Sequence, residues 1–276
     1  MSPSKQWVLP SGVAFVTGGA RGLGKAVALS FAREGCRGVT IVDVLPDDVL
    51  EATKQEVIKE GAKCLAIRCD VTDEAQVEKA VEATVAEFGR LDYAANAAGV
   101  AGPLGFTTAV DAAAFDKCLK INTLGVFICM KFQLRQMEKQ QPLTLEGRRV
   151  PQRGAIVNFA SVNSIMSGST TVAYTASKHA VYGMTKTAAL EYRQKNIRVN
   201  ALSPGFVYTS MAATDGSLGD PRLAEAWAGF EARQGRTAWP EEIGDAVALL
   251  CSPKMSLVNA QNLVCDNGFT VNENNF

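Results

Sequence analysis

The sequence predicts a doubly wound α/β fold in one domain, with seven parallel strands and helices on both faces of the sheet. Short apolar runs alternate with helical stretches along the whole chain, which is the order of βα units. The apolar runs are typical of strands buried on both faces. A glycine-rich turn joins the first strand to the first helix. At 276 residues, the chain fits one large domain.

Each expected element follows from its own stretch of sequence. The expected strands are 12–17, 39–43, 63–71, 91–96, 154–161, 197–203 and 260–266. The expected helices are 25–35, 47–60, 73–88, 111–137, 173–195 and 241–251. The polar stretch 138–153 is predicted to be an exposed excursion, because strand-like sequence resumes directly after it. The stretch 206–235 is expected as short pieces, broken at Gly216, Gly219 and Pro221.

Composition limits the classes of function. The 47% hydrophobic and 20% charged content describes a soluble globular protein with a large core. A net charge of +0 gives no support for a nucleic-acid or anionic membrane partner. No stretch resembles a signal sequence or is apolar for long enough to span a bilayer.

Cysteine and histidine usage argues against a metal site. The seven cysteines show no C-x-x-C pair, and His179 is the single histidine. We therefore expect no metal and a cytoplasmic protein with buried thiols. The cysteines expected to be buried are Cys36, Cys64, Cys69, Cys129, Cys251 and Cys265.

The turn after the first strand predicts a nucleotide site. It reads TGGARGLG and runs from Thr17 to Gly24. Gly18, Gly22 and Gly24 allow the backbone to turn tightly and to approach a pyrophosphate. The helix that follows offers unpaired N–H groups and the positive end of its dipole to the same phosphates.

Two charged residues bear on the choice of nucleotide. Asp43 ends the second strand, about 20 residues after Gly24. A carboxylate there accepts hydrogen bonds from the ribose hydroxyls of NAD and repels the additional phosphate of NADP. Arg21 in the glycine turn favours NADP instead. Because a desolvated like-charge contact opposes binding more than one flexible arginine favours it, we predict NAD.

Further candidates lie at the carboxyl ends of strands, where α/β folds bind their ligands. Asp70 and Val71 end the third strand, at a position suited to the edge of adenine. The small residues after the fourth strand allow two equal interpretations, a backbone passing close to a flat ligand or tight strand packing. These residues are Asn96, Ala97, Ala98 and Gly99. Asn122 lies inside the expected helix 111–137, where an asparagine usually faces solvent or marks a kink.

Tyr174 and Lys178 stand four residues apart in the alanine-rich stretch 173–195. At that spacing two side chains share one face of a helix. An ammonium beside a phenol favours the phenolate and would lower the pKa of Tyr174 from about 10, which makes proton transfer possible near neutral pH. The same spacing also describes an ordinary surface pair.

These motifs, in this order and at this spacing, resemble the short-chain dehydrogenase/reductase family, whose single-domain members have the Rossmann fold. TGGARGLG resembles the family's TGxxxGxG, NAAG its NNAG, YTASK its YxxxK and SPGFVYT its PGxxxT. Ser161 precedes Tyr174 at the spacing of the family's catalytic serine, and Asn122 matches the family's asparagine. The resemblance covers residues 10 to 271, which is nearly the whole chain.

The resemblance implies an NAD-dependent oxidoreductase acting on a secondary alcohol or ketone. Tyr174 would be the acid-base group, Ser161 would hold the substrate oxygen, and Lys178 would bind the nicotinamide ribose. Asn122 would anchor a water that passes protons from Lys178 to solvent. The expected cofactor contacts are Gly18, Arg21, Gly22, Leu23, Gly24, Asp43, Asp70, Val71, Asn96, Ala97, Ala98, Gly99, Tyr174, Lys178, Pro204, Gly205, Val207 and Thr209.

The chain departs from the family pattern at three places. Ala95 replaces the first asparagine of NNAG, and Asp266-Asn267-Gly268 replaces a closing Asp-Gly-Gly. The excursion 138–153 is long and similar to that of fungal members, which implies a role in secondary metabolism. We expect the last two departures to alter subunit contacts.

The substrate and the class of chemistry remain open at this point. Aromatic and apolar residues in 206–235 either lie over an apolar, cyclic substrate or simply pack this segment. They are Phe206, Tyr208, Met211, Trp227 and Phe230. Two alternatives to the oxidoreductase are a dehydratase or cyclase on the same scaffold and a protein that binds nucleotide only structurally.

The resemblance also implies an assembly. Helices 111–137 and 173–195 carry more apolar surface than one sheet face covers. Family members pair such helices into a four-helix bundle between subunits. We therefore expect a homotetramer or a dimer.

Overall fold

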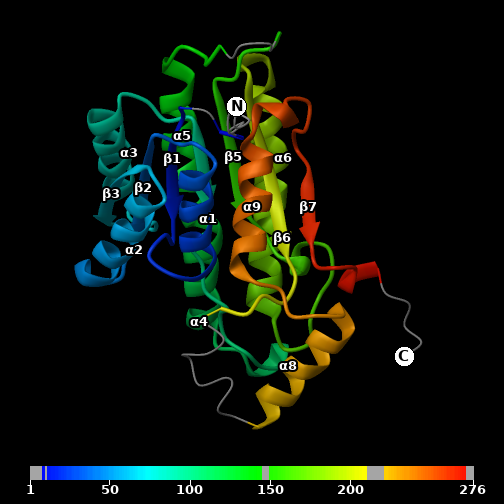
Figure 1. The fold of residues 1–276 in the computed structure, drawn as a ribbon. Helices are drawn as coiled ribbons and strands as arrows, with labels where there is room; N and C mark the ends of the chain where they lie inside the picture. The colour runs from blue at the N-terminus through cyan, green and yellow to red at the C-terminus, as the bar shows by residue number, and fades with distance from the viewer. Residues whose placement is uncertain (1–7, 10, 145–148, 210–220, 272–276) are drawn as a thin grey trace, which may run out of the picture.

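A three-layer sandwich of helices and parallel sheet is formed by residues 8–9, 11–144, 149–209 and 221–271, which the computed structural model describes (Figure 1). The sheet has seven strands in the order β3-β2-β1-β4-β5-β6-β7, and every neighbouring pair is parallel. The strands are β1 (Val13–Thr17), β2 (Gly38–Asp43), β3 (Lys63–Arg68), β4 (Tyr93–Asn96), β5 (Gly154–Phe159), β6 (Ile197–Pro204) and β7 (Asn262–Cys265). The predicted seven-stranded, doubly wound sheet is confirmed.

Helices cover both faces of this sheet. The described helices are α1 (Gly22–Arg33), α2 (Asp47–Lys59), α3 (Glu74–Phe88), α4 (Ala112–Leu119), α5 (Gly125–Lys139), α6 (Val172–Tyr192), α8 (Pro221–Gln234) and α9 (Pro240–Cys251). In Figure 1, α1 and α9 lie in front of the sheet, and α5 and α6 lie behind it. The central strands therefore contact apolar side chains on both sides, which explains their almost uninterrupted apolar sequence.

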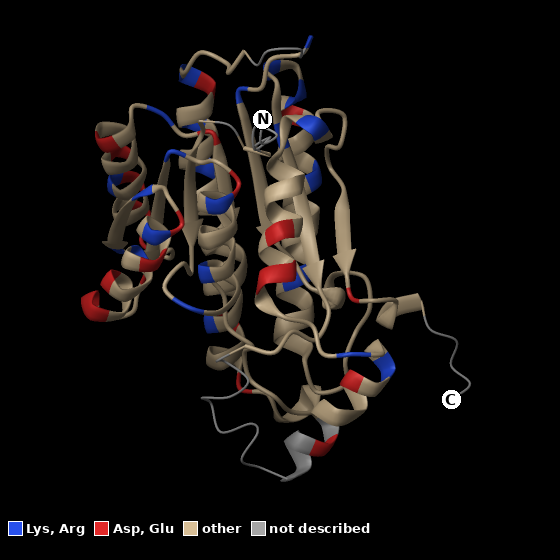
Figure 2. Ribbon diagram, viewed as in Figure 1, with Lys and Arg blue, Asp and Glu red and all other residues tan. Residues whose placement is uncertain are grey.

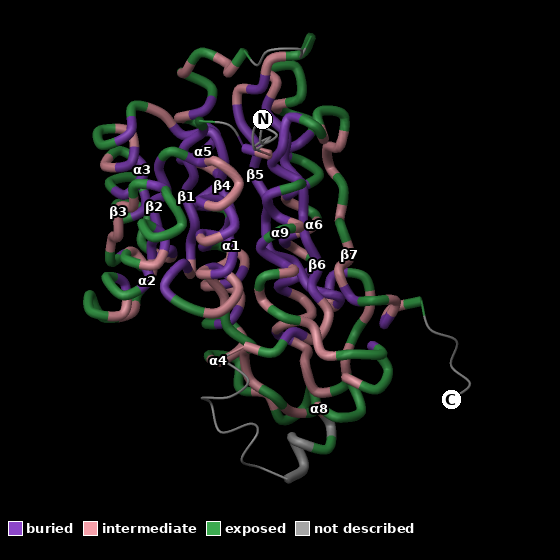
Figure 3. Tube along the Cα trace, in the orientation of Figure 1, coloured by how far each residue is buried: buried purple, intermediate pink, exposed green. Residues whose placement is uncertain are grey.

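Strand β1 shows how one strand serves two cores. Ala14 and Val16 belong to the core under α1 and α9, while Phe15 belongs to the core under α3, α5 and α6. Successive side chains of a strand point to opposite faces, so the two cores alternate along it. Figure 3 shows the resulting buried band through the middle strands, and Figure 2 shows charged residues mainly on the helices and loops around it.

The strand order reverses direction between β1 and β4, which are neighbours in space. Their register pairs Ala14 with Tyr93 and Thr17 with Asn96. The chain leaves β1 toward β2 and β3 on one side, and continues from β4 toward β5, β6 and β7 on the other. The loops at the carboxyl ends therefore separate here, and such a switch point is the usual ligand crevice of this architecture.

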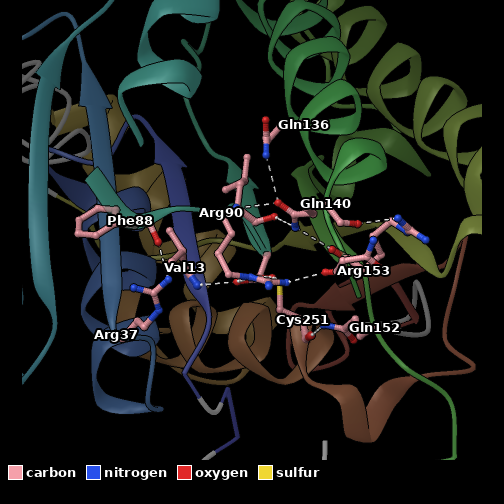
Figure 4. A network of polar contacts seen from close by, with 12 residues as sticks. Val13, Arg37, Phe88, Arg90, Gln136, Gln140, Gln152, Arg153 and Cys251 are labelled. Atoms are coloured by element: carbon pink, nitrogen blue, oxygen red, sulfur yellow. Dashed lines mark hydrogen bonds and ion pairs between the residues drawn. The ribbon is translucent and has the colours of Figure 1, made fainter. Parts of the chain in front are cut away.

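A polar network fixes the opposite, amino-terminal edge of the sheet (Figure 4). The Asp92 carboxylate accepts a hydrogen bond from the backbone N–H of Val13 at 3.0 Å. It also accepts hydrogen bonds from Nε and Nη2 of Arg90 at 2.7–2.9 Å. Asp92 is buried, so the paired guanidinium and the N–H offset the cost of placing a carboxylate there.

The same network holds both ends of the excursion 138–153. The Gln140 amide donates to the carbonyls of Leu91 and Arg153, and Leu143 pairs with Gln152 as an antiparallel bridge. The excursion therefore lies at the amino edge, away from the carboxyl ends where the candidate residues gather. Residues 145–148 lie outside the described residues.

Two expected elements were wrong. The helix predicted at 111–137 is interrupted by a π-helical turn, η2 (Lys120–Leu124), between α4 and α5. The stretch 206–235 contains a 14-residue helix, α8, instead of short pieces. Its Pro221 is the first helical residue, where a proline removes an N–H that has no partner in the helix.

The cysteines are free thiols, as expected. Cys36, Cys69, Cys129 and Cys251 are buried as predicted. Cys64 and Cys265 are only partly buried, and Cys118 is buried too. Among the described residues, no helix combines the length and hydropathy that a membrane crossing requires.

Candidate active site

A cavity of about 730 Å³ opens at the carboxyl edge of the sheet, across the switch point. Its walls come from the ends of β1 to β6 and from the elements that follow them. It contains 18 of the predicted catalytic and cofactor residues: Gly18, Arg21, Gly22, Leu23, Gly24, Asp43, Asp70, Val71, Ala97, Ala98, Gly99, Ser161, Tyr174, Lys178, Pro204, Gly205, Val207 and Thr209. Asn96 and Asn122 do not line it. The sequence did not identify Ile121, Lys117 and Lys120, which also line it.

The glycine turn forms the floor of this cavity. Gly18 has φ +64°, and a Cβ on it would lie 2.9 Å from backbone atoms of Ala98. A Cβ on Gly24 would overlap the carbonyl of Gly18. The loops after β1 and β4 therefore approach closely because neither glycine carries a side chain. No side chain caps the N-terminus of α1 at Arg21, and the first helical residues, Gly22 to Gly24, line the cavity.

Asp43 is held at one end of the cavity. Its carboxylate accepts hydrogen bonds from the backbone N–H groups of Ala20 at 3.1 Å and Leu45 at 3.2 Å. These bonds fix the carboxylate at the end of β2, beside the glycine turn. Arg21 lines the same cavity, so the two charges weighed in the sequence lie at one site.

Ser161, Tyr174 and Lys178 converge at the other end. Ser161 follows β5 and accepts a hydrogen bond from the N–H of Asn163 at 3.2 Å. Tyr174 and Lys178 lie on the first turns of α6, and the Lys178 Nζ lies 5.5 Å from the centre of the Tyr174 ring. The Lys178 ammonium donates to the carbonyl of Phe159 at 2.7 Å. A hydroxyl, a phenol and an ammonium thus share one wall.

The pKa shifts at this wall differ from the expectation. Burial raises the pKa of Tyr174, a hydrogen bond from Ser161 lowers it, and Cys118 raises it; Lys178 is not among the causes. Burial also lowers the pKa of Lys178 from 10.5 to about 8. The expected lowering of the Tyr174 pKa by Lys178 was wrong for this structure, because burial determines the direction of the shift and Lys178 does not contribute to it.

Asn122 is buried rather than exposed, and it lies in the π-helical turn. Its Oδ1 accepts from the N–H of Val100 at 2.8 Å, and its Nδ2 donates to the carbonyl of Val100 at 2.9 Å. Nδ2 also lies 3.1 Å from the hydroxyl of Ser177, next to Lys178. Asn122 therefore joins the loop after β4 to α6 directly behind the cavity wall.

Asn96 lies in a buried hydrogen-bond network and does not line the cavity. Its amide pairs twice with Gln133 of α5, at 2.8 and 3.0 Å, and donates to Asn158 of β5 at 2.8 Å. All three side chains are buried. Of the small residues after β4, only Ala97, Ala98 and Gly99 reach the cavity, and Asn96 supports the sheet below it.

The aromatic residues of 206–235 pack mainly on one another. Phe206 stacks on Phe230, with ring centres 3.9 Å apart, and contacts Trp227 and Phe269. Tyr208 packs against Trp239. Phe206, Trp227 and Phe230 do not line the cavity, so their rings pack this segment rather than the cavity itself. Met211 lies outside the described residues.

In the described part of the chain, no group of His, Cys, Asp and Glu side chains could hold a metal ion.

Known proteins resemble this chain over nearly its whole length. A family model described as enoyl-(acyl carrier protein) reductase matches residues 18–270. The short-chain dehydrogenase fogB of Aspergillus ruber is 38% identical, over 95% of this chain and 97% of that protein. (+)-Borneol dehydrogenase 2 of Salvia officinalis is 37% identical, over 94% of this chain and 89% of that protein.

Solved structures agree with these sequences. The crystal structure of levodione reductase has a TM-score of 0.86 and 36% identity, over 96% of this chain and 100% of that chain. The levodione reductase of Leifsonia aquatica is 37% identical in sequence, over 93% of both proteins. Two further solved structures of this fold contain NAD+ in one case and NADPH in the other.

Lys178→Met is expected to stabilise the protein without added nucleotide by about 1–3 kcal/mol at pH 7, because it removes a desolvated cation. Since the pKa of Lys178 is lowered from 10.5 to about 8, the folded chain holds this proton less tightly than the unfolded chain. The wild-type penalty is complete below about pH 8 and disappears as the pH rises toward 10.5. Urea denaturation across this range should show the advantage of the variant shrinking.

Lys186→Met is the matched control, because Lys186 is exposed on the same helix. Its stability difference from the wild type should not follow this pH trend. A Lys178→Met advantage that stays constant from pH 7 to pH 10 would contradict the lowered pKa.

Proposed function

We propose that this chain, which belongs to the short-chain dehydrogenase/reductase family, exchanges a hydride between NAD(H) and a cyclic or apolar secondary alcohol or ketone. Members of this family are oxidoreductases that act on CH–OH and C=O groups with nicotinamide cofactors. The observation that carries this proposal is the convergence of Ser161, Tyr174 and Lys178 on one cavity with the N-terminus of α1. When bound, the nicotinamide supplies the hydride acceptor or donor.

The cavity fits such a dinucleotide. A Cβ on Gly18 would meet the backbone of Ala98, and a Cβ on Gly24 would overlap the carbonyl of Gly18, so these two glycines allow the loops after β1 and β4 to meet at the cavity. The first-turn N–H groups of α1 are suited to a pyrophosphate. Asp43 and Asp70 stand at the ends of β2 and β3, whereas Ser161 and Pro204 stand at the ends of β5 and β6. This order supports adenosine at the first pair and nicotinamide at the second.

In this mechanism Tyr174 is the acid-base group. Burial keeps its phenol protonated at neutral pH, and that form donates a proton to a ketone oxygen during reduction. Ser161 donates a hydrogen bond to the same oxygen. Lys178 would hold the nicotinamide ribose, and Asn122 would anchor a water that connects Lys178 with solvent. Alcohol oxidation uses the phenolate, so its rate should rise with pH.

The substrate proposal rests on the relatives. Levodione reductase and (+)-borneol dehydrogenase are similar to this chain over 93% and 94% of its length, and their names denote cyclic ketone and alcohol chemistry. Val100, Ala101 and Val207 line the cavity and supply apolar surface. A cyclic, mainly apolar compound suits these residues better than a charged one.

Tyr174→Phe is expected to lower kcat by about 10²- to 10⁴-fold, because it removes the proton-transfer group and keeps the ring. Binding of NAD should persist, since the glycine turn and Lys178 are unchanged. The measurement is the absorbance of reduced nicotinamide with a panel of cyclic alcohols and ketones whose products are identified. Tyr182→Phe, at a half-buried tyrosine on the same helix, should leave kcat unchanged.

Wild-type turnover by Tyr174→Phe would make the phenol a bystander and overturn the mechanism. Product formation without any change in nicotinamide absorbance would instead support the dehydratase or cyclase alternative. Nucleotide binding without any turnover would support the scaffold alternative.

A further prediction concerns the choice of cofactor and rests on Asp43. We expect a higher kcat/KM with NAD than with NADP, and Asp43→Ser should reduce that ratio by about tenfold or more, because like charges at close range cost several kcal/mol. Asp48→Ser, at an exposed carboxylate in the first turn of α2, should leave the ratio unchanged. A wild-type preference for NADP would mean that Arg21 outweighs Asp43.

We also predict a homotetramer whose subunits meet through α5 and α6. Leu124, Phe127 and Leu190 are 42%, 49% and 59% exposed, and they lie on or next to these two helices. Light scattering should give a mass of several times 29.4 kDa, and Phe127→Glu should lower it. Phe106→Glu alters a phenylalanine that is 72% exposed outside these helices and should not. A wild-type mass near 29.4 kDa would contradict the assembly.

A further inference from the structure

Asn267 stands where the family's closing Asp-Gly-Gly has a glycine, and its side chain makes a hydrogen bond that a glycine could not make. Asn267 has φ +47°, a left-handed conformation that asparagine tolerates. Its Nδ2 donates to the backbone carbonyl of Gln234, the last residue of α8, at 2.7 Å. A glycine would adopt the same backbone conformation but could not make this bond. The asparagine therefore ties the segment after β7 to the end of α8.

The side chain of Gln234 in turn bonds to the backbone of Phe206. The Gln234 side chain is 1% exposed, and its amide pairs twice with the Phe206 backbone. The Oε1 accepts from the N–H of Phe206 at 2.8 Å, and Nε2 donates to the carbonyl of Phe206 at 2.8 Å and to that of Arg236 at 3.1 Å. A Cβ on Gly205 would overlap Oε1, so the glycine leaves the space that the amide occupies.

Phe206 lies between two residues that line the cavity but does not line it itself. Its neighbours Gly205 and Val207 line the cavity, together with Thr209, whereas its own ring does not line it, stacks on Phe230 and contacts Phe269 at a tilt. This stretch follows β6, on the same side of the switch point as Ser161. The backbone of one wall is therefore held from behind by two amide side chains and an aromatic stack.

We propose that Gln234 and Asn267 are positioning residues that hold the wall 205–209 in the conformation that receives the nicotinamide half of the cofactor. This inference rests on the proposed function. Neither side chain lines the cavity, so both act through the backbone of Phe206. Without them the wall samples other conformations, and the apparent affinity falls with the fraction of molecules that are competent to bind.

The test compares two ligands, NADH and ADP-ribose, which lacks the nicotinamide. Asn267→Gly should weaken NADH binding by about 3- to 10-fold, the range of one net hydrogen bond. It should leave ADP-ribose affinity unchanged, because ADP-ribose keeps both riboses and the pyrophosphate but lacks the nicotinamide ring that the wall 205–209 receives. Titration calorimetry of both ligands with the full chain measures the difference.

Asn196→Gly is the matched control. Asn196 has φ +57° and precedes the amino end of β6, so the substitution makes the same chemical change in the same backbone conformation away from the cavity. Both affinities should stay at their wild-type values. This control separates the loss of the Asn267 bond from the general effect of an added glycine.

Gln234→Met removes both bonds to Phe206 at similar side-chain volume, and it should weaken NADH more than Asn267→Gly does. Because Asn267 acts through Gln234, adding Asn267→Gly to Gln234→Met should weaken NADH little further. Equal losses for NADH and ADP-ribose, or no loss for either in Asn267→Gly, would overturn the positioning role. Absence of NADH binding by the wild-type chain would overturn the proposed function and this inference with it.

Discussion

The approach of the loop after β1 to the loop after β4 is the constraint on which the site depends. The backbone of Gly18 lies where a Cβ would be 2.9 Å from Ala98, and Gly24 packs against Gly18 with no room for a side chain. This approach brings the N-terminus of α1 to the same edge as Ala97–Gly99. The glycine turn there forms the floor of the cavity, between the two halves of the sheet. The rest of the carboxyl edge, from Asp43 to Thr209, is arranged along that floor.

Local sequence signals predicted the parts of the molecule that local physics determines. The alternation of strands and helices, the glycine turn and the residues at strand ends depend on neighbours in sequence, and the sheet and most of the cavity followed from them. The interruption at Asn122 depends instead on Val100 and Ser177, 22 and 55 residues away, whose bonds hold the asparagine in a π-helical turn. The helix α8 was missed because Pro221 begins a helix there rather than ending one.

The pair Tyr174 and Lys178 shows a second limit of sequence reasoning. Their spacing predicted one helix face, and the structure places both on the cavity wall. Spacing contains no information about solvent, however, and burial determines the direction of both pKa shifts. The ammonium bonds to the Phe159 carbonyl rather than to the phenol. Both shifts therefore have the same main cause, which is the removal of water from the phenol and from the ammonium.

The two sides of the cavity are held by different contacts, backbone against backbone on one side and side chains on the other. This difference determines which substitutions each side tolerates. On the side of the glycine turn, backbone lies against backbone, so a side chain at Gly18 or Gly24 would force the packed loops apart. On the side of β6, the wall at Phe206 is held by the Gln234 amide, the Asn267 amide and a phenylalanine stack. Side-chain contacts of this kind tolerate substitution in small steps, because each contributes about 1 kcal/mol. The departure from Asp-Gly-Gly lies on the adjustable side, while the glycine motif on the rigid side is complete.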